Sequence, residues 1–122
     1  MSLVFNTDDI LKKQDWTFPI RIVYGPDRFC EIGKLCGENE IKNPLIVTDK
    51  GSQYLPFISS LQSHLDVFDI ASDVFSGFSP NPRDTEVLSG KSVFNTGAHD
   101  AVIAIGGGSA MDGGKSICLT AN

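Results

Sequence analysis

Short apolar runs and stretches of helical periodicity alternate along most of the chain. The runs at 45–47 (LIV) and 101–105 (AVIAI) end at polar or glycine residues, which is typical of strands buried on both faces of a sheet. Residues 20–24 alternate apolar residues with an arginine, so we expect an extended segment there. A third strand is expected within residues 65–75, where the pattern does not fix its register.

Apolar residues at spacings of three and four predict helices between these strands. The first helix follows Gly25–Pro26 and ends near Gly37, the second runs from about Gly51 to His64, and the third covers residues 83–97. Before the third helix, the sequence favours Asn81 as its cap and Pro82 as its first helical residue.

Strands that alternate with helices of this length indicate βαβ units with a parallel sheet and right-handed crossovers. We therefore expect an α/β fold in which residues 1–19 form an arm or edge segment and residues 20–122 form one domain. The last helix runs out near Asn122 with no strand to receive its crossover, which leaves that side of the sheet unfinished. We expect an incomplete domain from the front part of a longer protein.

The segment from Ala101 to Lys115, AVIAIGGGSAMDGGK, carries the most chemical information. Gly106, Gly107 and Gly108 follow the strand without a Cβ, so a ligand can lie against bare peptide N–H groups. The helix that follows offers unpaired N–H groups and the positive end of its dipole, which suit a phosphate. The segment therefore predicts a strand, a phosphate-binding turn and a helix.

The same segment also allows a purely structural explanation. Ser109 and Asp112 have the S-x-x-D spacing of a capping box, which satisfies backbone donors without a ligand. The dinucleotide fingerprint G-x-G-x-x-G is not matched, because Met111 occupies its third glycine position. The position of the glycine loop in the fold has to decide between a phosphate-binding turn and a helix cap. Asp49 ends another predicted strand, and ligands bind at the edge where parallel strands end, so a nucleotide suits this edge.

Composition limits the partners of the protein. Its 122 residues are 41% hydrophobic and 20% charged, which is typical of a globular chain. A net charge of −5 argues against nucleic acid or an anionic membrane as a partner, and no stretch approaches the roughly 18–20 apolar residues of a membrane span. Three cysteines without CxxC spacing argue against a disulfide framework or a zinc knuckle. Because Asp8 and Asp9 occupy the place of a signal peptide's apolar core, we expect a cytoplasmic protein.

Four segments of the chain resemble, in order, segments of one enzyme family. They are FPIRIVYGPDRFCEIGKL, PLIVTDKG, VFSGFSPNPRDTEV and DAVIAIGGGSAMDGGK, the last being similar to a GGGS-x-x-D-x-x-K motif. The family is that of the iron-containing, or group III, alcohol dehydrogenases. The resemblance covers about Phe18 to Asn122 and implies a Rossmann-like dinucleotide-binding domain with a parallel sheet.

The resemblance also assigns contacts with the cofactor. Asp49 matches a position near the adenosine ribose, where a carboxylate accepts hydrogen bonds from the 2′-OH and repels a 2′-phosphate. This favours NAD over NADP. The other residues that it implicates are Asn81 along the cofactor, Gly106, Gly107, Gly108 and Ser109 at the pyrophosphate, and Asp112 and Lys115 near the cofactor cleft.

Structural alternatives stay open at several of these positions. Asp49 could cap the following helix, Asn81 could act only with Pro82 at a helix start, and Lys115 could be a solvated helix residue. Gly113–Gly114 stand where the family more often has a helix-favouring residue and alanine. They should loosen the helix or allow closer backbone packing.

The resemblance places the family's metal site outside this sequence. The family holds Fe²⁺ or Zn²⁺ with one Asp and three His of a helical C-terminal domain, and none of these lies within the 122 residues. We expect His64 and His99 to be surface or structural residues. Because it brings no metal ligands, the chain alone is expected to be inactive.

The resulting hypothesis is the cofactor-binding portion of an NAD-dependent, metal-dependent dehydrogenase that interconverts a small alcohol and its aldehyde or ketone. Relatives commonly pair through N-terminal strands, which suggests a homodimer and leaves the oligomeric state open. One alternative is a same-fold relative, namely a glycerol or glycerol-1-phosphate dehydrogenase or a dehydroquinate synthase. Another is a non-catalytic nucleotide-binding module, since the chain shows no nucleophile–base pair.

Overall fold

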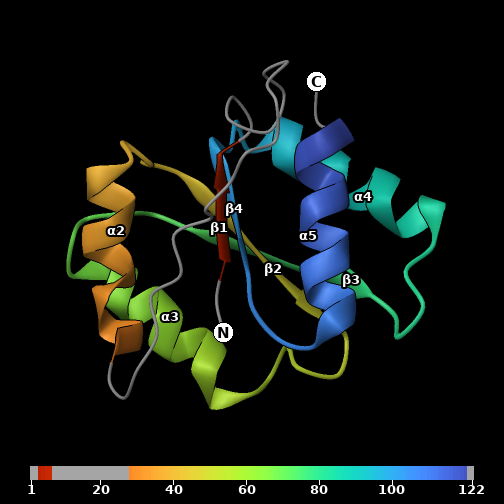
Figure 1. Ribbon diagram of the computed structural model, residues 1–122, viewed down its shortest axis with the longest axis horizontal. Coiled ribbons are helices and arrows are strands. Elements are labelled where there is room, and N and C mark those ends of the chain that lie inside the picture. The colour runs from red at the N-terminus through yellow and green to blue at the C-terminus, as the bar shows by residue number, and fades with distance from the viewer. Residues whose placement is uncertain (1–2, 7–27, 121–122) are drawn as a thin grey trace, which may run out of the picture.

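The computed structural model describes residues 3–6 and 28–120, which form a four-stranded sheet with helices on both faces (Figure 1). The strands are β1 (Leu3–Asn6), β2 (Pro44–Asp49), β3 (Asp73–Phe78) and β4 (Ala101–Ala104), and their order across the sheet is β1-β4-β2-β3. β4, β2 and β3 run parallel, whereas β1 pairs with β4 in the antiparallel direction. The predicted α/β fold with a parallel sheet is confirmed, and the structure adds an antiparallel edge strand.

Two pairs of helices cover the two faces of the sheet. A 3₁₀ turn, η1 (Arg28–Glu31), leads into α2 (Ile32–Glu38), which lies with α3 (Pro56–Asp66) on one face. α4 (Asp84–Thr96) and α5 (Gly108–Thr120) lie on the other face (Figure 1). None of the helices in the described part of the chain is long and apolar enough to cross a membrane.

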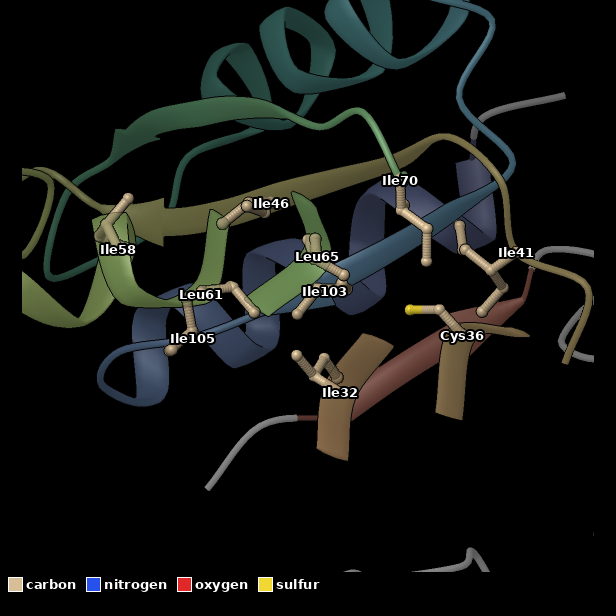
Figure 2. Packing of buried hydrophobic residues seen from close by; sticks show 11 residues of the cluster. Ile32, Cys36, Ile41, Ile46, Ile58, Leu61, Leu65, Ile70, Ile103 and Ile105 are labelled. Atoms are coloured by element: carbon tan, nitrogen blue, oxygen red, sulfur yellow. The ribbon is translucent and has the colours of Figure 1, made fainter. Parts of the chain in front are cut away.

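The central strands β2 and β4 contribute side chains to two separate apolar cores. Ile46 and Ile103 face α2 and α3 in the core shown in Figure 2, whereas Leu45 and Val102 face α4 and α5. Because side chains alternate along a strand, both faces of β2 and β4 have to be apolar. This explains why the two strands read as continuous apolar runs, and both of these predicted strands are confirmed.

The prediction of a third strand within residues 65–75 is wrong for most of that range. β3 begins only at Asp73 and lies at the edge of the sheet, where Phe78 is its one buried residue among five less buried ones. Ser76 and Gly77 have the character of turn residues but belong to this strand, near an irregularity in its pairing with β2. An edge strand buries too little surface to show a strong apolar pattern. The extended segment expected at residues 20–24 lies outside the described residues.

Two helix starts also differ from the prediction. α3 begins at Pro56 rather than near Gly51, because residues 52–55 form a turn in which the Leu55 N–H donates to the Ser52 carbonyl. α4 begins at Asp84, so Asn81 and Pro82 lie in the preceding loop and do not cap or open the helix.

Glycines let α5 approach its neighbours closely. A Cβ at Gly113 would overlap the ring of Phe78, and a Cβ at Gly114 would lie 3.0 Å from that of Ala104 on β4. Between the two helices, a Cβ at Gly90 would overlap the Ile117 side chain. Of the two consequences expected for Gly113–Gly114, close packing is therefore observed.

This packing predicts that Gly113→Ala destabilises the protein although alanine favours helices. We expect the free energy of unfolding to fall by about 1–3 kcal/mol, because the new methyl group meets the buried Phe78 ring. Gly37→Ala is the matched control, since a Cβ at Gly37 in α2 would meet nothing within 4 Å and should raise stability by up to about 1 kcal/mol. Urea denaturation measures both, and equal stability of the two variants would contradict the close packing.

Candidate functional site

β2 and β4 are neighbours that end at the same edge of the sheet, and the chain leaves them toward opposite faces. After β2 it passes to α3 on one face, and after β4 it passes to α5 on the other. Such a switch point opens a crevice in which α/β proteins bind their ligands. Asp49 ends β2 and the glycine loop, residues 106–108, follows β4, so both lie at this edge.

Gly106 is the residue that lets the glycine loop pass close to β2. Its φ of +134° lies in a region that side chains disfavour, and a Cβ there would lie 2.7 Å from Asp49 Oδ2 and 3.1 Å from Thr48 Oγ1. Gly108 differs, because a Cβ at that position would meet nothing within 4 Å. The loop therefore packs tightly at its first glycine and faces open space at its last.

The Asp49 carboxylate bridges the two strand ends. Its Oδ2 accepts a hydrogen bond of 3.2 Å from the Gly107 N–H. Burial by itself raises the pKa of Asp49, but the hydrogen bonds from Gly107 and Ser52 outweigh burial and hold the pKa below its ordinary value. Asp49 is thus a carboxylate at neutral pH, with one oxygen engaged by the glycine loop.

The N-terminus of α5 supplies further backbone N–H donors at this edge. The N–H groups of Ala110 and Met111 donate to the Gly107 carbonyl, whereas Gly108 and Ser109 occupy the first two helical positions, which have no intrahelical acceptor. These N–H groups lie at the positive end of the helix dipole. Because α5 begins at Gly108, Ser109 lies inside the first turn, and the capping-box explanation for Ser109 does not hold.

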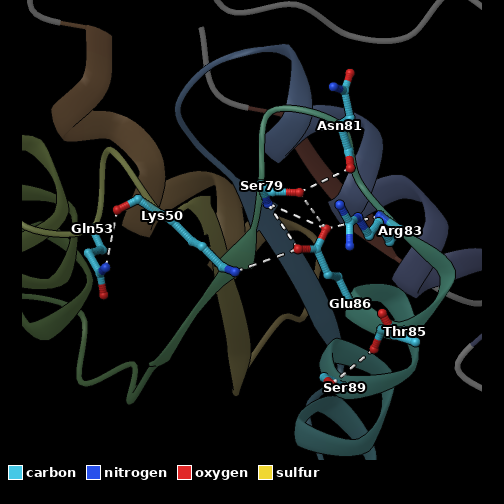
Figure 3. Close-up of polar contacts among 8 residues, drawn as sticks. All are labelled: Lys50, Gln53, Ser79, Asn81, Arg83, Thr85, Glu86 and Ser89. Carbon is cyan, nitrogen blue, oxygen red and sulfur yellow. Dashed lines mark hydrogen bonds and ion pairs between the residues drawn. The ribbon is translucent and has the colours of Figure 1, made fainter.

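The loop after β3 reaches the same edge. Asn81 lies in this loop and is exposed, and a network of polar contacts surrounds its neighbours (Figure 3). The Lys50 N–H, next to Asp49, donates to the Phe78 carbonyl at 2.9 Å and joins the ends of β2 and β3. The structure therefore brings Asp49, the glycine loop and the Asn81 loop, residues 79–83, to one edge.

Asp112 and Lys115 lie elsewhere on α5. Both are exposed, and the side of the helix that faces the sheet is made of small and apolar residues such as Ala110, Gly114 and Ile117. No described contact joins Asp112 or Lys115 to Asp49 or to the glycine loop. Their assignment to the cofactor cleft stays a prediction.

Sequence reasoning missed three residues at this edge. Thr48 is fully buried, and its Oγ1 lies beside Gly106 without a hydrogen-bond partner among the described residues. Ser52 contributes hydrogen bonds to Asp49, and Glu86 holds the Asn81 loop. A polar residue that closes an apolar strand is a signal that could have identified Thr48, whereas Glu86 gives no local signal.

Cys36, Cys118 and His99 are buried. Burial raises the pKa of Cys36 to about 11, with Asp100 adding to the shift, and burial raises that of Cys118 to about 12. His99 is buried, with Nδ1 3.0 Å from the Asn43 carbonyl oxygen and Nε2 3.3 Å from Asp73 Oδ2 in a direction that makes no hydrogen bond. Across residues 3–6 and 28–120, no three His, Cys, Asp or Glu side chains are placed to hold a metal ion.

Comparisons with known proteins give a consistent result. The family model described as iron-containing alcohol dehydrogenase matches residues 19–122. The 1,3-propanediol dehydrogenase of Citrobacter freundii is 35% identical over 109 residues, 88% of this chain and 28% of that protein. Lactaldehyde reductase of Escherichia coli K12 is 37% identical over 78 residues, 64% of this chain and 20% of that protein. The chain thus spans between a fifth and a third of the length of these relatives.

A solved structure agrees with the sequence comparisons. Sulfoacetaldehyde reductase from Bifidobacterium kashiwanohense, in complex with NAD⁺, superposes with a TM-score of 0.71 at 35% identity. The match covers 88% of this chain and 29% of that one.

The lowered pKa of Asp49 predicts a pH-dependent contribution to stability. A depressed carboxylate pKa contributes stability above the ordinary value of 3.8, and this contribution is lost as pH falls through the folded-state value. Asp49→Asn should therefore be less stable than the wild type at pH 7, and the difference should shrink as pH falls below 3.8 through the lowered pKa of Asp49. Urea denaturation between pH 2 and 7 measures this.

Ser52→Ala, which removes one group that hydrogen-bonds Asp49, should give a smaller difference over the same pH range. A constant offset between wild type and Asp49→Asn at every pH would contradict the role of the charge.

Proposed function

Because the chain belongs to the iron-containing alcohol dehydrogenase family, we propose that it supplies the NAD-binding site of an oxidoreductase that interconverts a small alcohol and its aldehyde or ketone. The relatives are named for 1,3-propanediol, lactaldehyde and sulfoacetaldehyde, which are small molecules with an alcohol or aldehyde group. These names support the substrate class. The NAD⁺ complex of the sulfoacetaldehyde reductase supports the cofactor.

The observation that carries this proposal is the contrast within the glycine loop. Gly106 is packed against Asp49 and Thr48, whereas the space beside Gly108 is open at the N-terminus of α5. A pyrophosphate fits there, because it can accept from the Gly108 and Ser109 N–H groups with the helix dipole behind them. The Gly107 N–H is already engaged by Asp49, so Gly107 contributes mainly its lack of a side chain.

Asp49 has two functions in this proposal. The carboxylate accepts from the glycine loop and from Ser52, and its remaining lone pairs would accept hydrogen bonds from a ribose diol. A negative charge at this position repels the 2′-phosphate of NADP, which favours NAD.

The hydride transfer itself depends on the bound cofactor rather than on residues of this chain. The nicotinamide of NAD supplies the hydride acceptor when it is bound. The residues of this chain bind and orient the cofactor at the sheet edge, and the described residues provide no ligand set for the metal that the family name implies.

The open space at Gly108 predicts that Gly108→Val weakens NAD binding without unfolding the protein. The side chain would enter the volume assigned to the pyrophosphate, and we expect the Kd for NAD to rise by about tenfold or more. Titration calorimetry measures the Kd, and thermal unfolding monitors stability. Gly37→Val is the matched control, because it adds the same side chain at an exposed helical glycine with equally open surroundings.

Equal binding by both valine variants would place the cofactor elsewhere. Wild-type protein with no affinity for NAD, NADP or ADP-ribose would contradict the proposed function itself.

The charge of Asp49 predicts a second effect, on the choice of cofactor. Asp49→Ser removes the charge but keeps a hydroxyl, so the ratio of the Kd for NADP to the Kd for NAD should fall by about tenfold. Titration of both nucleotides checks this. An unchanged ratio would show that Asp49 does not face the 2′ position.

A further inference from the structure

A single carboxylate holds both ends of the Asn81 loop, residues 79–83 between β3 and α4 (Figure 3). Glu86 Oε1 accepts hydrogen bonds of 2.9 Å from the Arg83 N–H at the end of the loop and 2.9 Å from the Ser79 hydroxyl at its start. The Ser79 N–H also lies 3.3 Å from Glu86 Oε2. Because these donors come from opposite ends of the loop, Glu86 fixes the separation of the two ends.

The same carboxylate joins the loop to β2. Lys50 Nζ lies 3.7 Å from Glu86 Oε2, and the Lys50 backbone N–H donates a hydrogen bond to the Phe78 carbonyl at the end of β3. Lys50 directly follows Asp49 in the sequence. The Asn81 loop is therefore linked through Glu86 to the strand end that carries Asp49.

Ser79 connects Glu86 to Asn81. The Ser79 hydroxyl lies within hydrogen-bond distance of both Glu86 Oε1, at 2.9 Å, and the Asn81 carbonyl, at 3.0 Å. A hydroxyl has one hydrogen to donate, so a change at Glu86 alters how Ser79 holds the Asn81 backbone. The Asn81 side-chain amide points away from Glu86 and Ser79, which leaves it free to contact a ligand (Figure 3).

Glu86 is suited to this role as an ion. The hydrogen bond from the Arg83 N–H is the largest influence on the pKa of Glu86 and lowers it. Hydrogen bonds from Ser79 and the charge of Lys50 lower it further. Together they outweigh desolvation, which raises it, so the pKa of Glu86 lies below its ordinary value. An ionised carboxylate only accepts hydrogen bonds, and every group that faces Glu86 here is a donor.

We propose that Glu86 is a positioning residue that sets the place of Asn81 against the bound cofactor, acting through Ser79 and Arg83. This inference rests on the proposed function, and it takes Asn81, an exposed residue at the same sheet edge as Asp49, as a further cofactor contact. Glu86 itself does not touch the cofactor.

A double-mutant cycle tests the inference by NAD titration of the protein. Asn81→Ala should raise the Kd for NAD about tenfold, the effect of a lost hydrogen-bonding side chain. Glu86→Gln should raise it about three- to fivefold, because the amide offers a donor toward other donors. In the Asn81→Ala background, Glu86→Gln should have no further effect on the Kd, since its role passes through Asn81. Asp84→Asn is the charge-matched control and should leave the Kd unchanged, because Asp84 is an exposed carboxylate in the same first turn of α4.

The outcomes separate the two hypotheses. Additive losses in the cycle, or wild-type affinity in Asn81→Ala, would overturn the role of Glu86 while NAD binding by the wild type upholds the proposed function. Absence of NAD binding by the wild type would overturn the proposed function and the inference with it. Should Glu86→Gln fail to fold, Ser79→Ala replaces it in the cycle, and the same non-additivity with Asn81→Ala is expected.

Discussion

The close approach of α5 to the sheet is the constraint on which the rest of the structure depends. Gly113 and Gly114 have no side chains where α5 crosses Phe78 and β4, and Gly106 turns the chain sharply where the helix is about to begin. These positions bring the N-terminus of α5 against the end of β2. Larger residues there would move the helix outward and carry its dipole away from Asp49.

The charge of Asp49 gives this arrangement its chemical character. A carboxylate beside the positive end of a helix is stabilised, and Asp49 also takes the Gly107 N–H that the loop would otherwise offer to a ligand. The first two glycines therefore serve the contact between the two strand ends, and the start of α5 faces outward. Under the proposed function, the pyrophosphate contacts narrow from the whole glycine run to the N–H groups of Gly108 and Ser109.

Much of the fold could be predicted because its signals are local. The two central strands are continuous apolar runs, and the glycine loop between β4 and α5 stands directly beside them in the sequence. The edge strand β3 was misplaced because an edge strand buries little surface, and its Ser76 and Gly77 resemble a turn. Asn81 and Pro82 have the right residue types to start a helix, but Glu86 supplies the partner for the Arg83 N–H, and the helix starts later.

The sequence by itself determined that a strand, a bare glycine turn and a helix follow one another at residues 101–120, because backbone geometry and hydrophobic periodicity act over a few residues. Only the tertiary structure decided which groups meet that turn. Asp49 and Thr48 reach Gly106 from nearly sixty residues away because β2 and β4 are neighbours in the sheet, and Glu86 joins Lys50 and Ser79 because three strand ends share one edge. Strand order depends on the packing of the whole chain, and no local pattern records it.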